Sequence, residues 1–149
     1  MKVFNRKFSR DYQELERIEA GLVLIGAEVK SVRAGHIRLD EAFVKIIGDE
    51  AYLINADVQI YQFSRPQGYD PRRSRKLLIH KKELLKLRVK MSGSSKLTII
   101  PVSCYNKGHI FKLEIALAKG RRDIEKKNLE KRRDIKLEEK REAKEYLKT

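Results

Sequence analysis

The run LTIIPVSCYNKGHIFKLEIAL, residues 97–117, decides the fold class of this 149-residue chain. Residues 97–105 are apolar and β-branched, the Asn-Lys-Gly triplet at 106–108 predicts a turn, and residues 110–117 alternate apolar with charged side chains. Alternation with a period of two is typical of a half-buried strand, so the run predicts an antiparallel hairpin. Pro101 cannot donate to a strand ladder, which predicts a sheet edge or a bulge at that point.

The sequence on the N-terminal side of this hairpin predicts more short strands and two helices. Strands are expected at 12–18 and 21–25, and a second hairpin pairs 42–47 with 51–54 across the turn at 48–50. One helix is expected at 27–34, ending at Gly35, and another at 81–90, started by a capping box between His80 and Glu83. Many short strands with few helices predict a mainly β protein, a small closed or partly open barrel.

Charge divides the chain into a body, residues 1–118, and a basic C-terminal tail, residues 119–149. The tail holds 13 basic and 8 acidic residues, too many charges to bury a core. The whole chain carries a formal net charge of +14, which predicts a polyanionic partner, either nucleic acid or an anionic membrane surface. The longest uncharged stretch, 97–106, is too short to span a bilayer, and no apolar run follows the N-terminus as a signal peptide would require.

The sequence gives little support for an enzyme active site or a metal site. A lone cysteine, Cys104, excludes a cysteine-based zinc site and lies in an apolar strand, where a buried structural thiol is favoured over a nucleophile. The three histidines share no ligand spacing, and no phosphate-binding glycine loop or nucleophile elbow is present. We therefore expect a soluble cytoplasmic protein that is not an enzyme and holds no metal or cofactor.

Basic residues concentrate between Arg65 and Lys90, where ten basic residues face only two acidic ones. Tyr61, Phe63 and Tyr69 lie close to the densest piece, 69–76, and this mixture suits phosphate contacts together with base stacking. RNA is favoured over DNA, because no helix-turn-helix, zinc-finger or basic-zipper pattern occurs. An ordinary solvated basic loop is the alternative interpretation of this segment.

Several motifs, in order and spacing, resemble the SsrA-binding (small protein B) family of bacterial trans-translation. They are NRK at 5–7, Tyr12, EAG at 19–21, GAEVKSVRAG at 26–35, DPRRSRKLL at 70–78, KKE at 81–83 and ALAKGRR at 116–122. The resemblance implies an oligonucleotide-binding-like (OB-like) antiparallel β-barrel with flanking short helices. It also implies binding to the tRNA-like domain of transfer-messenger RNA and entry of the complex into a stalled ribosome. Alanyl-tRNA synthetase and elongation factor Tu would be partners through the RNA.

Family RNA contacts carry over to matching positions. Asn5, Glu19, Leu78 and Lys112 match directly, and charge or motif adds further candidates. The full set of RNA-binding candidates is Asn5, Arg6, Glu19, Arg33, Arg72, Arg73, Arg75, Leu78 and Lys112. A carboxylate such as Glu19 can accept hydrogen bonds from an unpaired guanine, and Lys112 lies on the polar side of its strand, which suits a phosphate.

The tail is expected to contact the small-subunit decoding centre and the mRNA channel. Its candidates are Lys119, Gly120, Arg121, Arg122, Lys126, Lys127, Lys131, Arg132 and Arg133. Its composition favours a helix, but its apolar residues form no stripe and many charges at i,i+4 repel, so we expect disorder in the free protein and a helix on the ribosome. For the tail, the alternative is a permanently helical, solvated extension. For the function of the whole chain, the alternative is a generic barrel-type RNA-binding or ribosomal protein.

Overall fold

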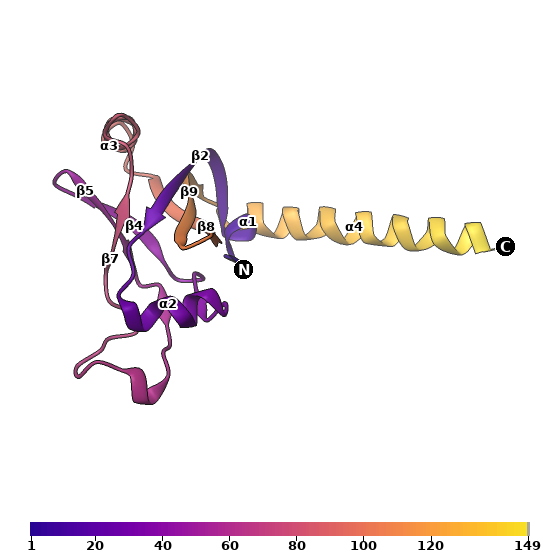
Figure 1. The fold of residues 1–149 in the computed structure, drawn as a ribbon. Coiled ribbons are helices and arrows are strands. Elements are labelled where there is room, and N and C mark those ends of the chain that lie inside the picture. Colours follow the sequence, from indigo (N-terminus) through magenta and orange to yellow (C-terminus); the bar gives the residue numbers. More distant parts are fainter. Residues whose placement is uncertain (149) are drawn as a thin grey trace.

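A computed structural model describes residues 1–148, except for the side chains of Gln62, Asp123, Ile124 and Lys148. It shows a mainly antiparallel β body from which one long helix projects (Figure 1). The strands are β1 (Lys2–Phe4), β2 (Tyr12–Leu22), β3 (Ile37–Arg38), β4 (Phe43–Ile47), β5 (Glu50–Ile54), β6 (Asp57–Val58), β7 (Arg75–Leu78), β8 (Leu97–Lys107) and β9 (Ile110–Gly120). The helices are α1 (Phe8–Asp11), α2 (Gly26–Arg33), the 3-10 turn η1 (Gln62–Ser64), α3 (Lys81–Ser92) and α4 (Asp123–Lys148).

The strands pair in a circuit that runs β8, β4, β5, β7, β2, β9 and back to β8. The β2–β9 and β8–β9 pairings are long, whereas β4 meets β8 at a single residue pair, Val44 with Ile99, among the described residues. The body is therefore an OB-like barrel whose weakest seam lies between β4 and β8, which confirms the predicted fold class. The short strands β3 and β6 form a separate ribbon.

The hairpin predicted at 97–117 is present as β8 and β9, and its register shifts between Pro101 and Ser103, as the proline predicts. The same bulge marks a change of partner on the other side of β8, because Ile99 pairs with β4 while residues 103–105 pair with β1. Asn5 lies at this branch point. Its backbone N–H donates to the Val102 carbonyl at 2.8 Å and its side-chain Nδ2 donates to the Pro101 carbonyl at 2.9 Å.

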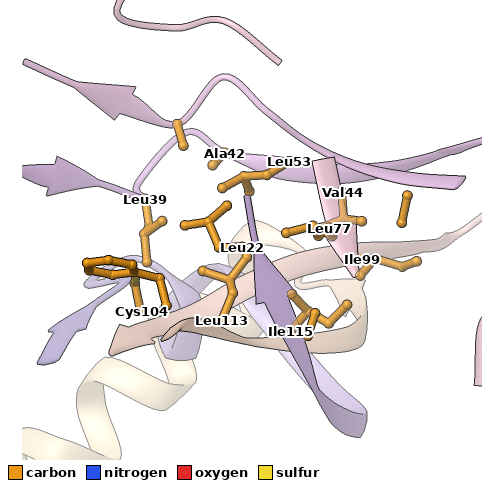
Figure 2. Packing of buried hydrophobic residues seen from close by; sticks show 14 of the residues in the cluster. Leu22, Leu39, Ala42, Val44, Leu53, Leu77, Ile99, Cys104, Leu113 and Ile115 are labelled. Carbon is orange, nitrogen blue, oxygen red and sulfur yellow. The ribbon is translucent and has the colours of Figure 1, made fainter. Parts of the chain in front are cut away.

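Apolar side chains from every strand of the circuit fill the barrel (Figure 2). Leu53, Ile99 and Leu113 are completely buried there, as is Cys104. Burial raises the pKa of the Cys104 thiol to about 12, so the residue is a protonated structural thiol, as predicted. A smaller cluster lies under α1 on the outer face of the sheet; its buried members are Phe8, Ile100, Val102, Ala116 and Ala118.

The structure departs from the sequence predictions in a few places. β2 is one continuous strand with a bulge between Glu14 and Glu16, where two strands were expected. The His80 side chain does not cap α3; its carbonyl accepts the Leu84 N–H instead, at 2.9 Å. The strand β9 continues to Gly120, so the predicted body–tail boundary at residue 118 falls inside the barrel. No helix in the described part of the chain is long and apolar enough to cross a membrane.

Among the described side chains, the ion pairs and hydrogen bonds between α4 and α1 lie in the first half of the helix. Arg10 Nε lies 2.9 Å from Glu130 Oε1, and Lys126 Nζ lies 3.5 Å from Asp11 Oδ1. Arg133 Nη2 donates to Ser9 Oγ at 3.2 Å, the most distal contact with α1. Beyond residue 133 the helix points away from the barrel (Figure 1), and its described side chains are exposed.

Candidate nucleic-acid interface

A row of directly paired residues crosses five strands on the outer face of the barrel. Leu78 in β7 pairs with Gly21 in β2, Gly21 pairs with Lys112 in β9, Lys112 pairs with Tyr105 in β8, and Tyr105 pairs with Lys2 in β1. Residues that pair across a ladder project to the same face of a sheet. These five residues, which we call the cross-sheet row, therefore form one surface with apolar, aromatic and cationic parts.

Leu78 and Gly21 make the first part of the row open and flat. Leu78 is 58% exposed, so it is a surface leucine and not a core residue. A Cβ on Gly21 would lie only 3.2 Å from Leu78 Cβ, tighter than ordinary packing allows. Glycine at position 21 thus keeps the leucine in place and leaves the middle of the row free for a flat ligand group to approach.

Glu19 lies two residues before Gly21, on the same face of β2, and its carboxylate faces three partners. Lys112 Nζ is 3.7 Å from Oε1, Lys107 Nζ is 3.5 Å from Oε2, and the Tyr105 hydroxyl donates to Oε2. The lysines outnumber the carboxylate, so the surface keeps positive charge. All of these side chains are partly or fully accessible, so an incoming ligand can replace their present ion-pair and hydrogen-bond partners.

Two ammonium groups lie near the ring of Tyr105. Lys2 Nζ lies 5.6 Å and Lys107 Nζ 5.9 Å from the ring centroid, both within the range of cation–π attraction. The cross-sheet row therefore joins lysine ammonium groups to an aromatic ring and an exposed leucine. This combination suits single-stranded or looped RNA, whose bases are free to stack while its phosphates pair with lysine.

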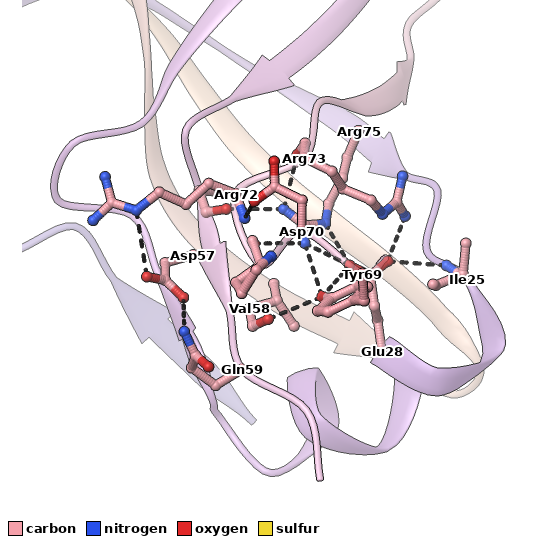
Figure 3. A network of polar contacts seen from close by, with 12 residues as sticks. Ile25, Glu28, Asp57, Val58, Gln59, Tyr69, Asp70, Arg72, Arg73 and Arg75 are labelled. Carbon is pink, nitrogen blue, oxygen red and sulfur yellow. Dashed lines mark hydrogen bonds and ion pairs between the residues drawn. The ribbon is translucent and has the colours of Figure 1, made fainter. Parts of the chain in front are cut away.

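A buried polar network lies next to this face, between α2 and the 55–75 segment (Figure 3). Glu28 and Arg75 are both completely buried. Glu28 Oε2 accepts from Arg75 Nε at 2.8 Å and lies 2.9 Å from the Tyr69 hydroxyl, while Oε1 accepts from Arg73 and from the Ile25 N–H. Arg75 also donates to the carbonyls of Ala56 and Pro71, at 2.8 and 2.9 Å. The network fastens the long 55–75 connection to α2.

Comparison with known proteins identifies the family. A family model described as SmpB protein matches residues 2–145. The chain is 47% identical over 134 residues to the SsrA-binding protein of Sulfurihydrogenibium sp. (strain YO3AOP1), covering 90% of this chain and 88% of the relative. The chain belongs to the SmpB family. The SsrA-binding protein of Mesoplasma florum, a further relative, is 43% identical over 141 residues, or 94% of each chain.

A solved structure agrees with the SmpB assignment. One of its chains, described as "tmRNA-SmpB: a journey to the center of the bacterial ribosome", superposes with a TM-score of 0.67 at 38% identity. The match covers 82% of the present chain and 85% of that chain. The OB-like body described above is thus shared with an SmpB family member.

The positions carried over from the SmpB family fall in two places. Glu19, Leu78 and Lys112 come together on the face of the cross-sheet row, although they lie on three different strands. Asn5 is buried at the β8 bulge, where its side chain holds the N-terminal segment. Arg6 follows it as an exposed residue without an ion-pair partner among the described side chains, and Arg33 is exposed with its guanidinium 5.9 Å from the Phe111 ring.

The arginines of the DPRRSRK motif have separate roles, and one prediction is wrong. Arg75 cannot contact RNA, because its guanidinium is fully buried against Glu28. Arg73 is paired with the same carboxylate and is only partly exposed, and its buried Nε has no hydrogen-bond partner among the described residues. Arg72 is half exposed, with Nε 3.5 Å from Asp57 Oδ2. Of the three, Arg72 is the most accessible to RNA.

The predicted tail residues fall into two groups, those held against the body and those in α4. Lys119 and Gly120 belong to strand β9, and the Arg121 backbone N–H donates to the Asp11 carbonyl at 2.8 Å, so these residues are tied to the body. Arg122 precedes α4. The remaining candidates, Lys126, Lys127, Lys131, Arg132 and Arg133, lie in the first half of α4. Ile124 stands where the family usually carries an aromatic residue or histidine, and its side chain is outside the described ones.

Sequence reasoning missed Gly21, Tyr105 and Lys2 as parts of the surface, because their neighbours come from strand pairing and not from local sequence. It also missed Glu28. A signal existed, since Glu28 and Val32 are one helical turn apart and share the buried face of α2. A carboxylate on the apolar face of a short helix, in a chain rich in arginine, indicates a buried ion pair.

The network predicts acid-sensitive stability. Burial alone raises the pKa of Glu28, but the hydrogen bonds from Arg73 and Arg75, with those from Ile25 and Tyr69, outweigh it and lower the pKa to about 2. Because the folded-state pKa lies below the ordinary value of 4.5, this stabilisation is present above pH 4.5 and is lost as the pH falls toward 2. Through Glu28, the stability in urea unfolding should change little between pH 7 and 4.5 and should fall between pH 4.5 and 3. A Glu28→Gln variant should show a smaller decrease over the same range, and an equal decrease would contradict the role of this group.

Proposed function

We propose that this protein binds transfer-messenger RNA through the cross-sheet row and Glu19 and delivers it to stalled ribosomes for trans-translation. The observation that carries the proposal is the assembly of Glu19, Leu78 and Lys112 on one accessible face around Gly21 and Tyr105. The row offers phosphate-binding lysines, a ring and an exposed leucine, as an unpaired RNA loop requires. The tRNA-like domain, around its D-loop, is the expected target, and the body would replace the anticodon side that this RNA lacks.

The protein would act as an adaptor without covalent chemistry of its own. Alanyl-tRNA synthetase would charge the RNA and elongation factor Tu would deliver it, both as partners through the RNA. The site of action is then the ribosome in the cytoplasm. In support of a binding role, the accessible side chains of the row are two lysines, a tyrosine and a leucine, with the Glu19 carboxylate beside them, while the only thiol is buried in the barrel.

The tail would sense whether a message occupies the mRNA channel. We propose that the basic side chains of α4 enter the channel when no message fills it, so that an intact message excludes the tail by steric competition. Lys127, Lys131 and Arg132 suit this role, since they are exposed and have no ion-pair partner among the described side chains. Free in water, a helix with so few apolar contacts is marginal, and we propose that α4 beyond its contact with α1 becomes ordered only on the ribosome.

Glu19 and Lys112 should contribute differently to RNA binding. Lys112→Ala should weaken binding to many RNAs and reduce the dependence of log K on log salt by about one unit or less, because one phosphate contact is lost. Glu19→Ala should instead cost selectivity for transfer-messenger RNA, on the order of 1–3 kcal/mol, if a base donor loses its acceptor. Filter binding of transfer-messenger RNA and an unrelated duplex at several salt concentrations separates the two effects. Equal losses on the unrelated duplex would exclude a specific role for Glu19.

A further inference from the structure

An exposed aromatic pair lies in the connection between β6 and β7, away from the cross-sheet row in the fold. Tyr61 is 67% and Phe63 82% exposed, and their ring centroids lie 5.3 Å apart with the planes tilted by 58°. They lie in residues 60–69, which we call the aromatic arm. The arm extends beyond α2 at the end of the body opposite α3 (Figure 1). Large apolar side chains with this exposure indicate a binding surface when they occur together.

The arm is held at both ends. Ile60 is buried in the main core, and Tyr69 lies 2.9 Å from both Glu28 Oε2 and the Val58 carbonyl (Figure 3). Within the arm, the Ser64 N–H donates to the Tyr61 carbonyl at 2.9 Å and the Tyr69 N–H to the Pro66 carbonyl at 3.1 Å. The buried Glu28 network therefore fixes the base of the arm on the body, and the two turns shape its tip.

The chemistry of the arm favours a nucleobase as its ligand. Arg65 is the single charged residue between positions 60 and 69, and its guanidinium lies 5.9 Å from the Tyr69 ring. Flat rings beside arginine, without a carboxylate to repel phosphate, suit single-stranded RNA. A protein partner fits less well, because the residues around the rings, Ser64, Arg65 and Gln67, are polar and exposed, so they cannot exclude water as the centre of a protein interface does.

We propose that Tyr61 and Phe63 form a second RNA site, which stacks on an unpaired base at a position separate from the cross-sheet row. The inference rests on the proposed function only in taking RNA as the partner. One protein could then hold RNA at two points of its body, with lysine and tyrosine on the sheet and with paired rings on the arm. Two such contacts on one RNA would strengthen binding through effective concentration.

The test uses the absence of tryptophan from this chain. Phe63→Trp introduces a unique fluorophore in the full-length protein, and stacking on a base should quench it. The matched control is Leu85→Trp on α3, where the leucine is 61% exposed and lies in another part of the fold. Both variants are titrated with a 12-nucleotide oligoadenylate and with transfer-messenger RNA. We expect both RNAs to quench F63W and not L85W, and Tyr61→Ala to weaken oligoadenylate binding roughly tenfold.

Each other outcome overturns the inference. Unchanged emission of F63W with oligoadenylate and with transfer-messenger RNA, or equal quenching of both variants, would exclude stacking at the arm. Retention of a protein from RNase-treated cell extract by the unsubstituted chain but not by Tyr61→Ala, together with unchanged F63W emission in RNA, would show that the arm binds a protein instead. Gel-shift titration of the unsubstituted chain with transfer-messenger RNA runs in parallel. If that binding fails, the proposed function fails, while the oligoadenylate titration still decides the arm.

Discussion

Replacing Lys126, Lys127, Lys131, Arg132 and Arg133 with glutamate is expected to stop peptide tagging on stalled ribosomes. The five substitutions lower the formal net charge from +14 to +4, and they place carboxylates where the channel presents RNA phosphates. Transfer-messenger RNA binding should remain largely intact, because the cross-sheet row lies on other elements. Tagging is measured with a message that lacks a stop codon, and RNA binding by gel shift on the same protein.

Two of the five residues also contact the body, which calls for a control. Lys126 pairs with Asp11 and Arg133 donates to Ser9, so their reversal also disturbs the start of α4. A variant with only Lys127, Lys131 and Arg132 changed to glutamate keeps both contacts and should still lose most tagging. Normal tagging by both variants would contradict the role of the tail. Loss of RNA binding together with tagging would contradict the separation of body and tail.

Glu28→Ala is expected to lower the free energy of unfolding by about 3–5 kcal/mol, the usual cost of removing one partner of a buried ion pair. The variant leaves the Arg75 guanidinium buried without its carboxylate, and it also removes a partner of Arg73 and Tyr69. Urea unfolding followed by circular dichroism measures the loss. The effect should be among the largest of any single substitution in this chain, because Glu28 joins α2 to the 55–75 segment.

Glu50→Ala is the matched control for this variant. Glu50 Oε1 also pairs with a cation, Lys76 Nζ at 2.9 Å, but both side chains are about half exposed. Exposed pairs add little to stability, so the unfolding midpoint should scarcely move. If Glu28→Ala were no more destabilising than Glu50→Ala, the network would not be what holds the segment, and the base of the aromatic arm would have to be fixed by other contacts.

The parts of the fold that local pattern determines were predictable. Alternation in 110–117 and the apolar run before it predicted the β8–β9 hairpin, and Pro101 predicted its bulge. The short strands β1, β3, β6 and β7 were not predicted. A strand as brief as Lys2–Phe4 is too short for a periodicity, and it forms because Asn5 and the bulge open a pairing position on β8.

The candidate site was predictable only in part, for a similar reason. A match to family positions made Glu19, Leu78 and Lys112 candidates for RNA binding. Their assembly on one face, however, depends on the register of β2 with β7 and β9. Charge and motif together made Arg75 an RNA-binding candidate, but its side chain is fully buried. A basic run does not say which guanidinium faces solvent, and here the buried Glu28 draws one arginine fully inside.

The central claim is that the cross-sheet row binds transfer-messenger RNA, and a pair of charge reversals tests it most directly. Lys112→Glu changes the row, while Lys86→Glu changes an exposed lysine on α3 and lowers the net charge by the same amount. Affinity for transfer-messenger RNA is measured for both full-length variants at one salt concentration. We predict that Lys112→Glu weakens binding roughly tenfold or more, since it replaces a phosphate contact with a repulsion, and that Lys86→Glu stays close to the unsubstituted protein. Equal losses for the two variants would show that net charge, and not this face, binds the RNA.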